Sequence, residues 1–409
     1  MGAAAAKPRN VVIVGGSYVG IRLAQALLPS LPSTHRLVVV EANSHFHHLF
    51  TFPRFSVLRR GGEEKALVPY SHALVDAEKP GVEGRMVHAR AVAIHESGEG
   101  GYLQLDRKVD DFGEKIDFDY LALATGTELR EPWSLPSASH DGAQAKHEAV
   151  NTLRSYQDSI AAANQIVIVG GGAVGVQVAC DIAEVYPGRN VTVVHSRERL
   201  MNTFHPDLHD VVAKRFAERG VRTRLGVRVD LPREGFPTFE EGKMVDVRLQ
   251  DGSKLEADLV LMCTGQTPRS ELLASYAPTA ITKNGFISVQ PTLQIQSPHP
   301  TVLHKRIFAL GDIADSGAAK TVRSAIGQIQ TVKNNILALI QGAQKLEHFN
   351  PGPSGIHLQL GLYESIKFAN PTDGGEPRNG GVQRDSAADL GVERMWDSLR
   401  VPKGTNWKL

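Results

Sequence analysis

Glycines in two short segments of the chain have the spacing of a turn that binds a pyrophosphate. The segments are NVVIVGGSYVGIRLAQALL (10–28) and QIVIVGGGAVGVQVACDIA (165–183), and in each an apolar strand, the turn and an amphipathic helix follow one another. The glycines let the backbone approach the phosphates, whose charge meets unpaired N–H groups at the start of the helix. We therefore predict two dinucleotide sites. Their turn residues are Gly15, Gly16, Ser17 and Gly20 in the first segment and Gly170, Gly172 and Gly175 in the second.

The residue that ends the strand after each turn indicates which nucleotide is bound. In the first copy it is Glu41, about 20 residues beyond the last glycine, where an acid can bind a ribose diol. In the second copy the strand ends at His195, and Ser196 and Arg197 follow where the acid would stand. Serine and arginine can accept a 2′-phosphate, so NADPH is predicted to bind at least as well as NADH. The alternative is that Arg197 is a solvated surface residue.

Three further strands run into short turns. The motifs are DYLALATGT (119–127), DLVLMCTGQTP (258–268) and RIFALGDIAD (306–315). A single dehydrogenase domain would not carry this set in this order. The candidate cofactor-binding residues in these turns are Gly126, Gly311 and Asp312.

In their order along the chain, these motifs resemble those of the two-dinucleotide-binding flavoproteins, the FAD- and NAD(P)H-dependent pyridine nucleotide-disulfide oxidoreductase superfamily. Within it the chain is similar to the branch of apoptosis-inducing-factor-like and ferroptosis-suppressor-type, or AMID-like, quinone reductases, over about residues 10–345. The resemblance implies an α/β protein with two Rossmann-like dinucleotide-binding domains and a short C-terminal extension. It also implies that FAD binds at the first glycine turn and the Gly-Asp motif, and NAD(P)H at the second turn.

The resemblance implies contacts to FAD from residues outside the first turn as well. Asp312 would bind the ribityl chain, and the backbone of Val92 would touch the adenine. Arg54 would also contact FAD. A helix that begins near Thr321 would point its positive end at the flavin pyrimidine ring, and Lys320 would add to that field, stabilising charge on the reduced flavin.

Two positions depart from the family's pattern. Ser17 stands where the second glycine of the first turn is expected, and its hydroxyl can donate to a phosphate oxygen. Gln177 stands two residues after Gly175, where the resemblance predicts a glutamate close to the nicotinamide. A glutamine can hydrogen-bond a carboxamide but cannot relay a proton. Gln177 is therefore expected to act in the site without acid–base chemistry.

The chain has two cysteines, Cys180 and Cys263, which are far apart in the sequence. Disulfide reduction in the wider superfamily requires two cysteines that are close together beside the flavin. That chemistry and thiol-based peroxide reduction are set aside, so the flavin must pass electrons directly to an acceptor. Hydride transfer needs a dry stacking site more than acid–base groups, so few catalytic side chains are expected. The predicted acceptor is a quinone, which is flat and apolar and would stack where apolar and aromatic residues line the pocket.

The segment HFHHLFTFPRF (45–55) is predicted to line the quinone pocket with aromatic residues. His45, His47 and His48 lack the spacing of a metal site and no cysteine cluster accompanies them, so no metal is predicted. The favoured interpretation is that some of these histidines face solvent and others pack near the flavin. His48 is the candidate to protonate a reduced quinone, since imidazole titrates near neutral pH.

Composition and the two terminal segments bear on whether the protein binds nucleic acid or a membrane. Lys and Arg total 45 against 44 Asp and Glu, and the net charge of +1 argues against nucleic-acid binding. The first ten residues hold no signal-peptide core, and no apolar run approaches a spanning helix, so a cytoplasmic protein is expected. Trp396 and Trp407 lie among basic residues, as in a peripheral anchor for a membrane, mitochondrial or lipid-droplet surface. A terminus packed back on the protein is the alternative that we favour, and the oligomeric state stays open.

The chain is predicted to form a discontinuous domain with a second domain inserted, joined by a linker rich in Pro, Ser and Gly. In the C-terminal segment, IHLQLGLYESIKF (356–368) is expected to form strands over the flavin, and 369–391 a loop. The predicted divisions are an FAD-binding domain, 1–130 and 282–345, an NAD(P)H-binding domain, 131–281, and the C-terminal segment, 346–409.

The leading functional hypothesis is an FAD-dependent NAD(P)H:quinone oxidoreductase. A reductase for an iron–sulfur electron-carrier protein would use the same two cofactors, and the sequence marks no partner surface that separates the two. A third interpretation is an apoptosis-related signalling protein whose redox state controls the binding of a partner.

Overall fold

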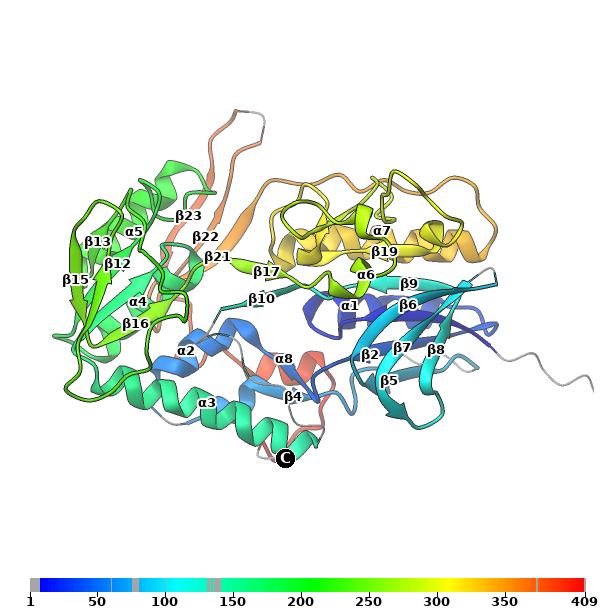
Figure 1. The fold of residues 1–409 in the computed structure, drawn as a ribbon, viewed down its shortest axis with the longest axis horizontal. Coiled ribbons are helices and arrows are strands. Elements are labelled where there is room, and N and C mark those ends of the chain that lie inside the picture. The colour runs from blue at the N-terminus through cyan, green and yellow to red at the C-terminus, as the bar shows by residue number, and fades with distance from the viewer. Residues whose placement is uncertain are drawn as a thin grey trace, which may run out of the picture.

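A computed structural model describes residues 8–59, 61–75, 81–98, 100–130, 133, 135, 141–372 and 374–407. Two parallel sheets lie side by side, each with helices packed against it (Figure 1). This is the predicted α/β architecture with two Rossmann-like domains, which is confirmed. The first seven residues, on which the cytoplasmic expectation partly depends, lie outside the described residues.

The first domain is built on a five-stranded parallel sheet in the order β19-β9-β1-β2-β5. Along β1, Val11 and Ile13 pack with the helices, whereas Val12 and Val14 pack with an antiparallel sheet on the opposite face. Because both faces are covered there, residues 11–14 of the strand are apolar without interruption. The strands are β1 Arg9–Val14, β2 His35–Glu41, β5 Gly84–His88, β9 Tyr120–Leu123 and β19 Ile307–Ala309. The covering elements are helices α1 Tyr18–Leu27 and α7 Val322–Ile340 and strands β6 Ala91–Ser97, β7 Gly100–Val109 and β8 Gly113–Phe118.

The second domain repeats this plan with a four-stranded parallel sheet in the order β13-β12-β11-β16. Its core includes the apolar side of β11 and the helix that follows it. The strands are β11 Gln165–Val169, β12 Asn190–Val194, β13 Arg222–Arg224 and β16 Leu259–Met262. The other elements are helices α3 Gly142–Ala162, α4 Ala173–Val185 and α5 Pro206–Glu218 and the hairpin β14 Val245–Arg248 with β15 Lys254–Ala257.

Two short strands connect the sheets. Strand β10, Thr127–Leu129, pairs antiparallel with β17, Gln266–Pro268, so the chain leaves the first sheet and returns to it through adjacent segments. Part of the predicted linker, 130–144, lies outside the described residues, and helix α3 begins within its last three residues, capped by the Asp141 side chain. The smaller elements are β3 His45–His47, α2 Phe52–Val57, β4 Leu67–Pro69, α6 Glu271–Ala274, β18 Ile287–Ser288 and β20 Ala314–Asp315.

The C-terminal segment forms a three-stranded antiparallel sheet of β21 Gly355–Gln359, β22 Ser365–Ala369 and β23 Arg378–Gln383. The predicted strands are present, but their apolar side chains pack into the core of the second domain beside α4. The prediction of a loop over 369–391 is partly wrong, because β22 offers an edge with which β23 pairs.

The last helix, α8, spans Glu393–Ser398 and packs on the first domain. Trp396 is buried, its Nε1 donates to the carbonyl of Lys65 at 2.8 Å, and its ring lies 4.5 Å from that of Trp407. The packed terminus, favoured over an anchor, is therefore correct for these tryptophans. Across the part of the chain that the structure describes, no helix combines the length and apolarity needed to cross a membrane.

Candidate active site

The first glycine turn excludes side chains by close backbone contacts. Gly15 has a φ of +100°, and a Cβ there would lie 2.4 Å from the carbonyl oxygen of Ala124. A Cβ on Gly20 would lie 1.7 Å from the Gly15 carbonyl oxygen. Ser17 is the N-cap of α1 but its side chain makes no capping hydrogen bond. The first N–H groups of α1 are thus left for a ligand, which fits a pyrophosphate.

Glu41 is directed at this turn, as the sequence predicts for a ribose-binding acid. Its Oε2 accepts a hydrogen bond from the Gly16 backbone N–H at 2.5 Å, and its Oε1 accepts one from the Asn43 N–H at 2.8 Å. Each carboxylate oxygen has a second lone pair, so both can also accept hydroxyl groups of a ribose. Burial raises the pKa of Glu41, and the two backbone N–H groups oppose that rise.

The Gly-Asp motif lies beside the same helix. Gly311 has a φ of +79°, its N–H donates to Oε1 of Gln328 at 2.8 Å, and a Cβ there would lie 3.1 Å from Val19 of α1. Asp312, next along the chain, is half-buried, and burial raises its pKa. The structure thus brings the two predicted parts of the first site together.

The remaining residues that were predicted to bind FAD lie outside the first turn and the Gly-Asp motif. Lys320 donates to the carbonyl of Ala314, lies 4.3 Å from the centre of the Phe286 ring, and has a pKa lowered by burial. The helix after it begins where the sequence predicts, and Thr321 caps it by accepting the N–H of Ser324 at 3.2 Å. The side chain of Val92 is 45% exposed on β6. Gly126 has a φ of +66°, and no described atom would lie within 4 Å of a Cβ there.

The second turn has the same geometry. Gly170 has a φ of +121°, and a Cβ there would lie 2.3 Å from the carbonyl oxygen of Cys263. A Cβ on Gly175 would lie 1.9 Å from the Gly170 carbonyl oxygen. At Gly172, the position of Ser17 in the first turn, a Cβ would meet no described atom within 4 Å. This open space is where a phosphate would approach, so the turn fits a dinucleotide.

His195 occupies the place that Glu41 has in the first domain, a role that we did not assign from the sequence. Its Nδ1 accepts the Gly171 N–H at 3.1 Å, as Glu41 accepts that of Gly16. Its Nε2 then carries the proton and faces Oδ1 of Asn202 at 3.2 Å. Burial lowers the pKa of His195, so the ring is neutral at pH 7. The position that a carboxylate occupies in the first domain therefore carries no negative charge in the second, and Arg197 is exposed just beyond it.

Buried polar atoms beside the second turn lack partners. Gln177, on α4, is 9% exposed, and its Nε2 has no hydrogen-bond partner among the described residues. The same holds within those residues for Oγ1 of Thr264, which follows the carbonyl that contacts Gly170. Buried polar groups are rarely left unpaired, so both atoms fit a site that a polar ligand completes.

The histidine segment is mostly core. Phe46, Phe52 and Phe55 are buried, which overturns their expected place in a pocket wall, whereas Phe50 is 54% exposed. His48 accepts or donates a hydrogen bond with the Tyr18 hydroxyl at 2.6 Å. Burial lowers the pKa of His48 to about 4 and that of His47 to about 3. His48 is therefore neutral at pH 7, and the expectation that it protonates a quinone by titrating near neutral pH is corrected.

This neutrality predicts that His48 leaves no mark on the pH dependence of turnover. Replacing His48 with glutamine, which keeps a polar partner for Tyr18, should give a kcat profile with no altered inflection between pH 6 and 8. The measurement is NADPH oxidation with a soluble quinone at each pH. An inflection near pH 6.5 that disappears on substitution would show that His48 titrates in catalysis.

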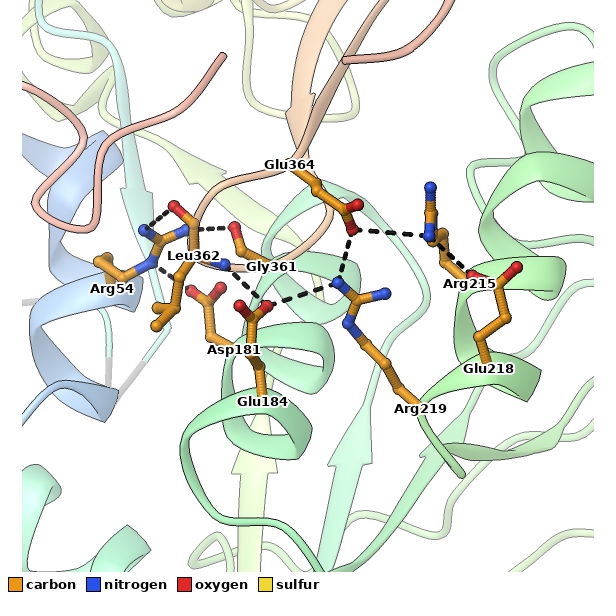
Figure 2. A network of polar contacts seen from close by, with 9 residues as sticks. All are labelled: Arg54, Asp181, Glu184, Arg215, Glu218, Arg219, Gly361, Leu362 and Glu364. Atoms are coloured by element: carbon orange, nitrogen blue, oxygen red, sulfur yellow. Dashed lines mark hydrogen bonds and ion pairs between the residues drawn. The ribbon is translucent and has the colours of Figure 1, made fainter. Parts of the chain in front are cut away.

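Arg54 has a different role from the one that the resemblance implies. Its side chain has no exposed surface, so it offers nothing to FAD in this conformation. The guanidinium instead donates to Asp181 of the second domain and to carbonyl groups of the C-terminal segment (Figure 2). The expected FAD contact is corrected to a contact of α2 with α4 and the C-terminal segment. Its partners are remote in the sequence, which is why the motif did not reveal them.

The cysteines are separate and unreactive. Cys180 is buried in α4 and Cys263 follows β16, and both thiols are free. Burial raises the pKa of each to about 12, which suppresses the thiolate. Among the residues that the structure describes, no three His, Cys, Asp or Glu side chains gather into a group that could hold a metal ion.

Comparisons with known proteins agree with this geometry. The family model for pyridine nucleotide-disulphide oxidoreductases matches residues 9–338. Fe-regulated protein 8 of Mycosarcoma maydis is 38% identical over 98% of this chain and 97% of its own, and ferroptosis suppressor protein 1 of Homo sapiens is 26% identical over 96% of each. The fold is similar to that of a sulfide:quinone oxidoreductase from Aquifex aeolicus, with a TM-score of 0.66 and 19% identity over 92% of this chain and 86% of that one. It is also similar to putidaredoxin reductase in complex with putidaredoxin, with a TM-score of 0.60 and 21% identity over 90% and 82%. The chain therefore belongs to the pyridine nucleotide-disulphide oxidoreductase family, with FAD and NAD(P)H as its cofactors, in the ferroptosis-suppressor-type branch that its motifs resemble.

Proposed function

We propose that this protein oxidises NAD(P)H and passes the electrons from its flavin directly to a quinone. The observation that carries the proposal is the placement of the two cysteines, which are separate and free, Cys180 buried and Cys263 half-buried, in a chain with two dinucleotide turns. With no cysteine pair to receive electrons, the acceptor must reach the flavin itself. The relatives named ferroptosis suppressor protein 1 belong to the branch for which the sequence resemblance implies quinone reduction.

Bound FAD supplies a flavin that accepts a hydride and releases electrons to an acceptor. In the proposed mechanism the chain contributes position rather than acid–base chemistry. Glu41 holds the adenosine ribose and the first N–H groups of α1 hold the pyrophosphate. Gln177 hydrogen-bonds the nicotinamide carboxamide from α4. Lys320 and the start of α7 favour negative charge on the flavin.

The proposal is tested by NADPH oxidation with purified FAD-loaded protein and a soluble quinone as the sole acceptor. We expect continuous turnover. A flavin that NADPH bleaches but that no quinone reoxidises would overturn the proposal. Reoxidation only by an iron–sulfur protein would instead favour a reductase for an iron–sulfur electron-carrier protein. The similar fold of putidaredoxin reductase, which was solved in complex with putidaredoxin, makes this the second candidate function. A protein that passes electrons to no acceptor would favour a signalling role.

The neutral His195 and the exposed Arg197 predict a preference for NADPH. Reversing the charge with Arg197→Glu should raise the KM for NADPH at least tenfold, about 1.4 kcal/mol, and leave that for NADH nearly unchanged, because only NADPH carries the 2′-phosphate. Arg199→Glu, an exposed position on the same loop, is the control for the general field. Equal effects on both donors, or equal effects of both substitutions, would contradict a specific phosphate contact.

A further inference from the structure

Two buried polar atoms stand one turn apart on α4 without hydrogen-bond partners among the described residues. They are Nε2 of Gln177 and Oδ1 of Asp181, which are a donor and an acceptor. Residues four apart on a helix lie on the same side, within reach of one another. The Gln177 side chain lies close enough to be among the groups that lower the pKa of Asp181, although the two orphan atoms do not form a hydrogen bond in this conformation. A rotation of the Gln177 side chain would join the two atoms.

The other oxygen of Asp181 is held by a residue of α2. Nε of Arg54, on α2, donates to Oδ2 of Asp181 at 2.8 Å, and neither side chain has exposed surface. Burial raises the pKa of Asp181, and the charge of Arg54 opposes that rise. Arginine stays protonated and would otherwise bury its charge alone, so we take Asp181 as its ionised counter-ion. An ionised carboxylate only accepts hydrogen bonds.

The C-terminal segment also contacts both α2 and α4 beside the Arg54–Asp181 pair (Figure 2). Nη2 of Arg54 donates to the carbonyl of Gly361 at 2.8 Å, and Glu184 of α4 accepts the N–H of Leu362 at 3.0 Å. Gly361 has a φ of +132°, and a Cβ there would lie 2.2 Å from Oε2 of Glu184. Arg219 joins Glu184 to Glu364. Helix α4 is therefore held to α2 and to the turn between β21 and β22.

We propose that Asp181 is a positioning residue that orients the Gln177 amide for the nicotinamide. By accepting one N–H of Gln177, the carboxylate directs the nitrogen end of the amide toward α4 and leaves the second N–H and the carbonyl for the nucleotide. Because Arg54 holds Asp181 from α2, the orientation of the hydride donor is coupled to the packing of α2 against α4. The inference rests on the proposed placement of the nicotinamide beside Gln177.

A double-mutant cycle tests this coupling in FAD-loaded protein. The variants are Gln177→Met, Asp181→Asn and the two together, with Asp210→Asn, an exposed acid on α5, as the matched control. The measurements are the rate at which NADPH bleaches the flavin and the dissociation constant of NADP⁺. We expect each single variant to slow bleaching about tenfold and the double variant to be no slower than either, because Asp181 acts through Gln177. Asp210→Asn should match the unmodified protein.

Losses that multiply to about a hundredfold in the double variant would overturn the proposal, as would an Asp181→Asn protein that bleaches at the normal rate. If Gln177→Met alone changes nothing, the nicotinamide does not lie beside it, while the quinone assay decides the proposed function separately.

A measurement on the unmodified protein covers the case in which Asp181→Asn does not fold. In its ¹⁵N spectrum, one Gln177 side-chain N–H, assigned by its loss in Gln177→Met, should be shifted by a hydrogen bond before NADP⁺ is added. Two unshifted protons would overturn the proposal.

Discussion

Replacing Gly175 with alanine should give a protein that is still yellow but that NADPH no longer bleaches. A Cβ at this position would lie 1.9 Å from the Gly170 carbonyl oxygen, a backbone atom that cannot yield without opening the turn. Opening the turn moves the N–H groups that face the pyrophosphate, and we expect the affinity for NADPH to fall at least a hundredfold. The visible spectrum before and after anaerobic NADPH measures both outcomes, since FAD binds in the other domain.

The matched substitution in the first turn should have the opposite result. In Gly20→Ala the new Cβ would lie 1.7 Å from the Gly15 carbonyl oxygen, so this protein should be purified without its yellow colour. Gly352→Ala is the control, because a Cβ there would meet none of the described atoms within 4 Å and its φ is not positive. If Gly175→Ala is bleached as fast as the unmodified protein, the second turn does not hold the nucleotide.

The parts of the site that were predicted from the sequence depend on neighbours within one strand–turn–helix unit. The glycine turns are such units, because Gly15 and Gly20, or Gly170 and Gly175, meet across five residues. Their position predicts a strand before and a helix after, and both are present. The start of α7 after Thr321 is likewise a local capping signal.

The parts that escaped prediction depend on contacts between remote segments. His195 lies at a strand end where an acid is expected, and only its contact with the Gly171 N–H shows that the imidazole substitutes for the carboxylate. Arg54 sits in a segment that resembles a cofactor contact, but its partners are 127 or more residues away. The pKa of His48 depends on burial by other segments, which residue type alone does not reveal.

The buried ion pair between α2 and α4 predicts a large loss of stability when one partner is removed. Arg54→Ala leaves the Asp181 carboxylate buried without its cation, and breaking a buried pair in this way costs about 3–5 kcal/mol. Carbonyl groups of the C-terminal segment, among them those of Gly361 and Ala388, lose their donor as well. We expect the free energy of unfolding, measured with denaturant on FAD-loaded protein, to fall by at least this amount.

A second variant separates the charge from the lost hydrogen bonds. In Arg54→Met with Asp181→Leu both charges are gone and apolar side chains fill the space, so the part of the loss that comes from the unpaired carboxylate should be recovered. The part that comes from the carbonyl groups should remain, because methionine donates no hydrogen bond. The double variant should therefore be more stable than Arg54→Ala and less stable than the unmodified protein. If Arg54→Ala unfolds at the same denaturant concentration as the unmodified protein, the pair does not hold α2 to α4, and the apolar packing of the two helices suffices.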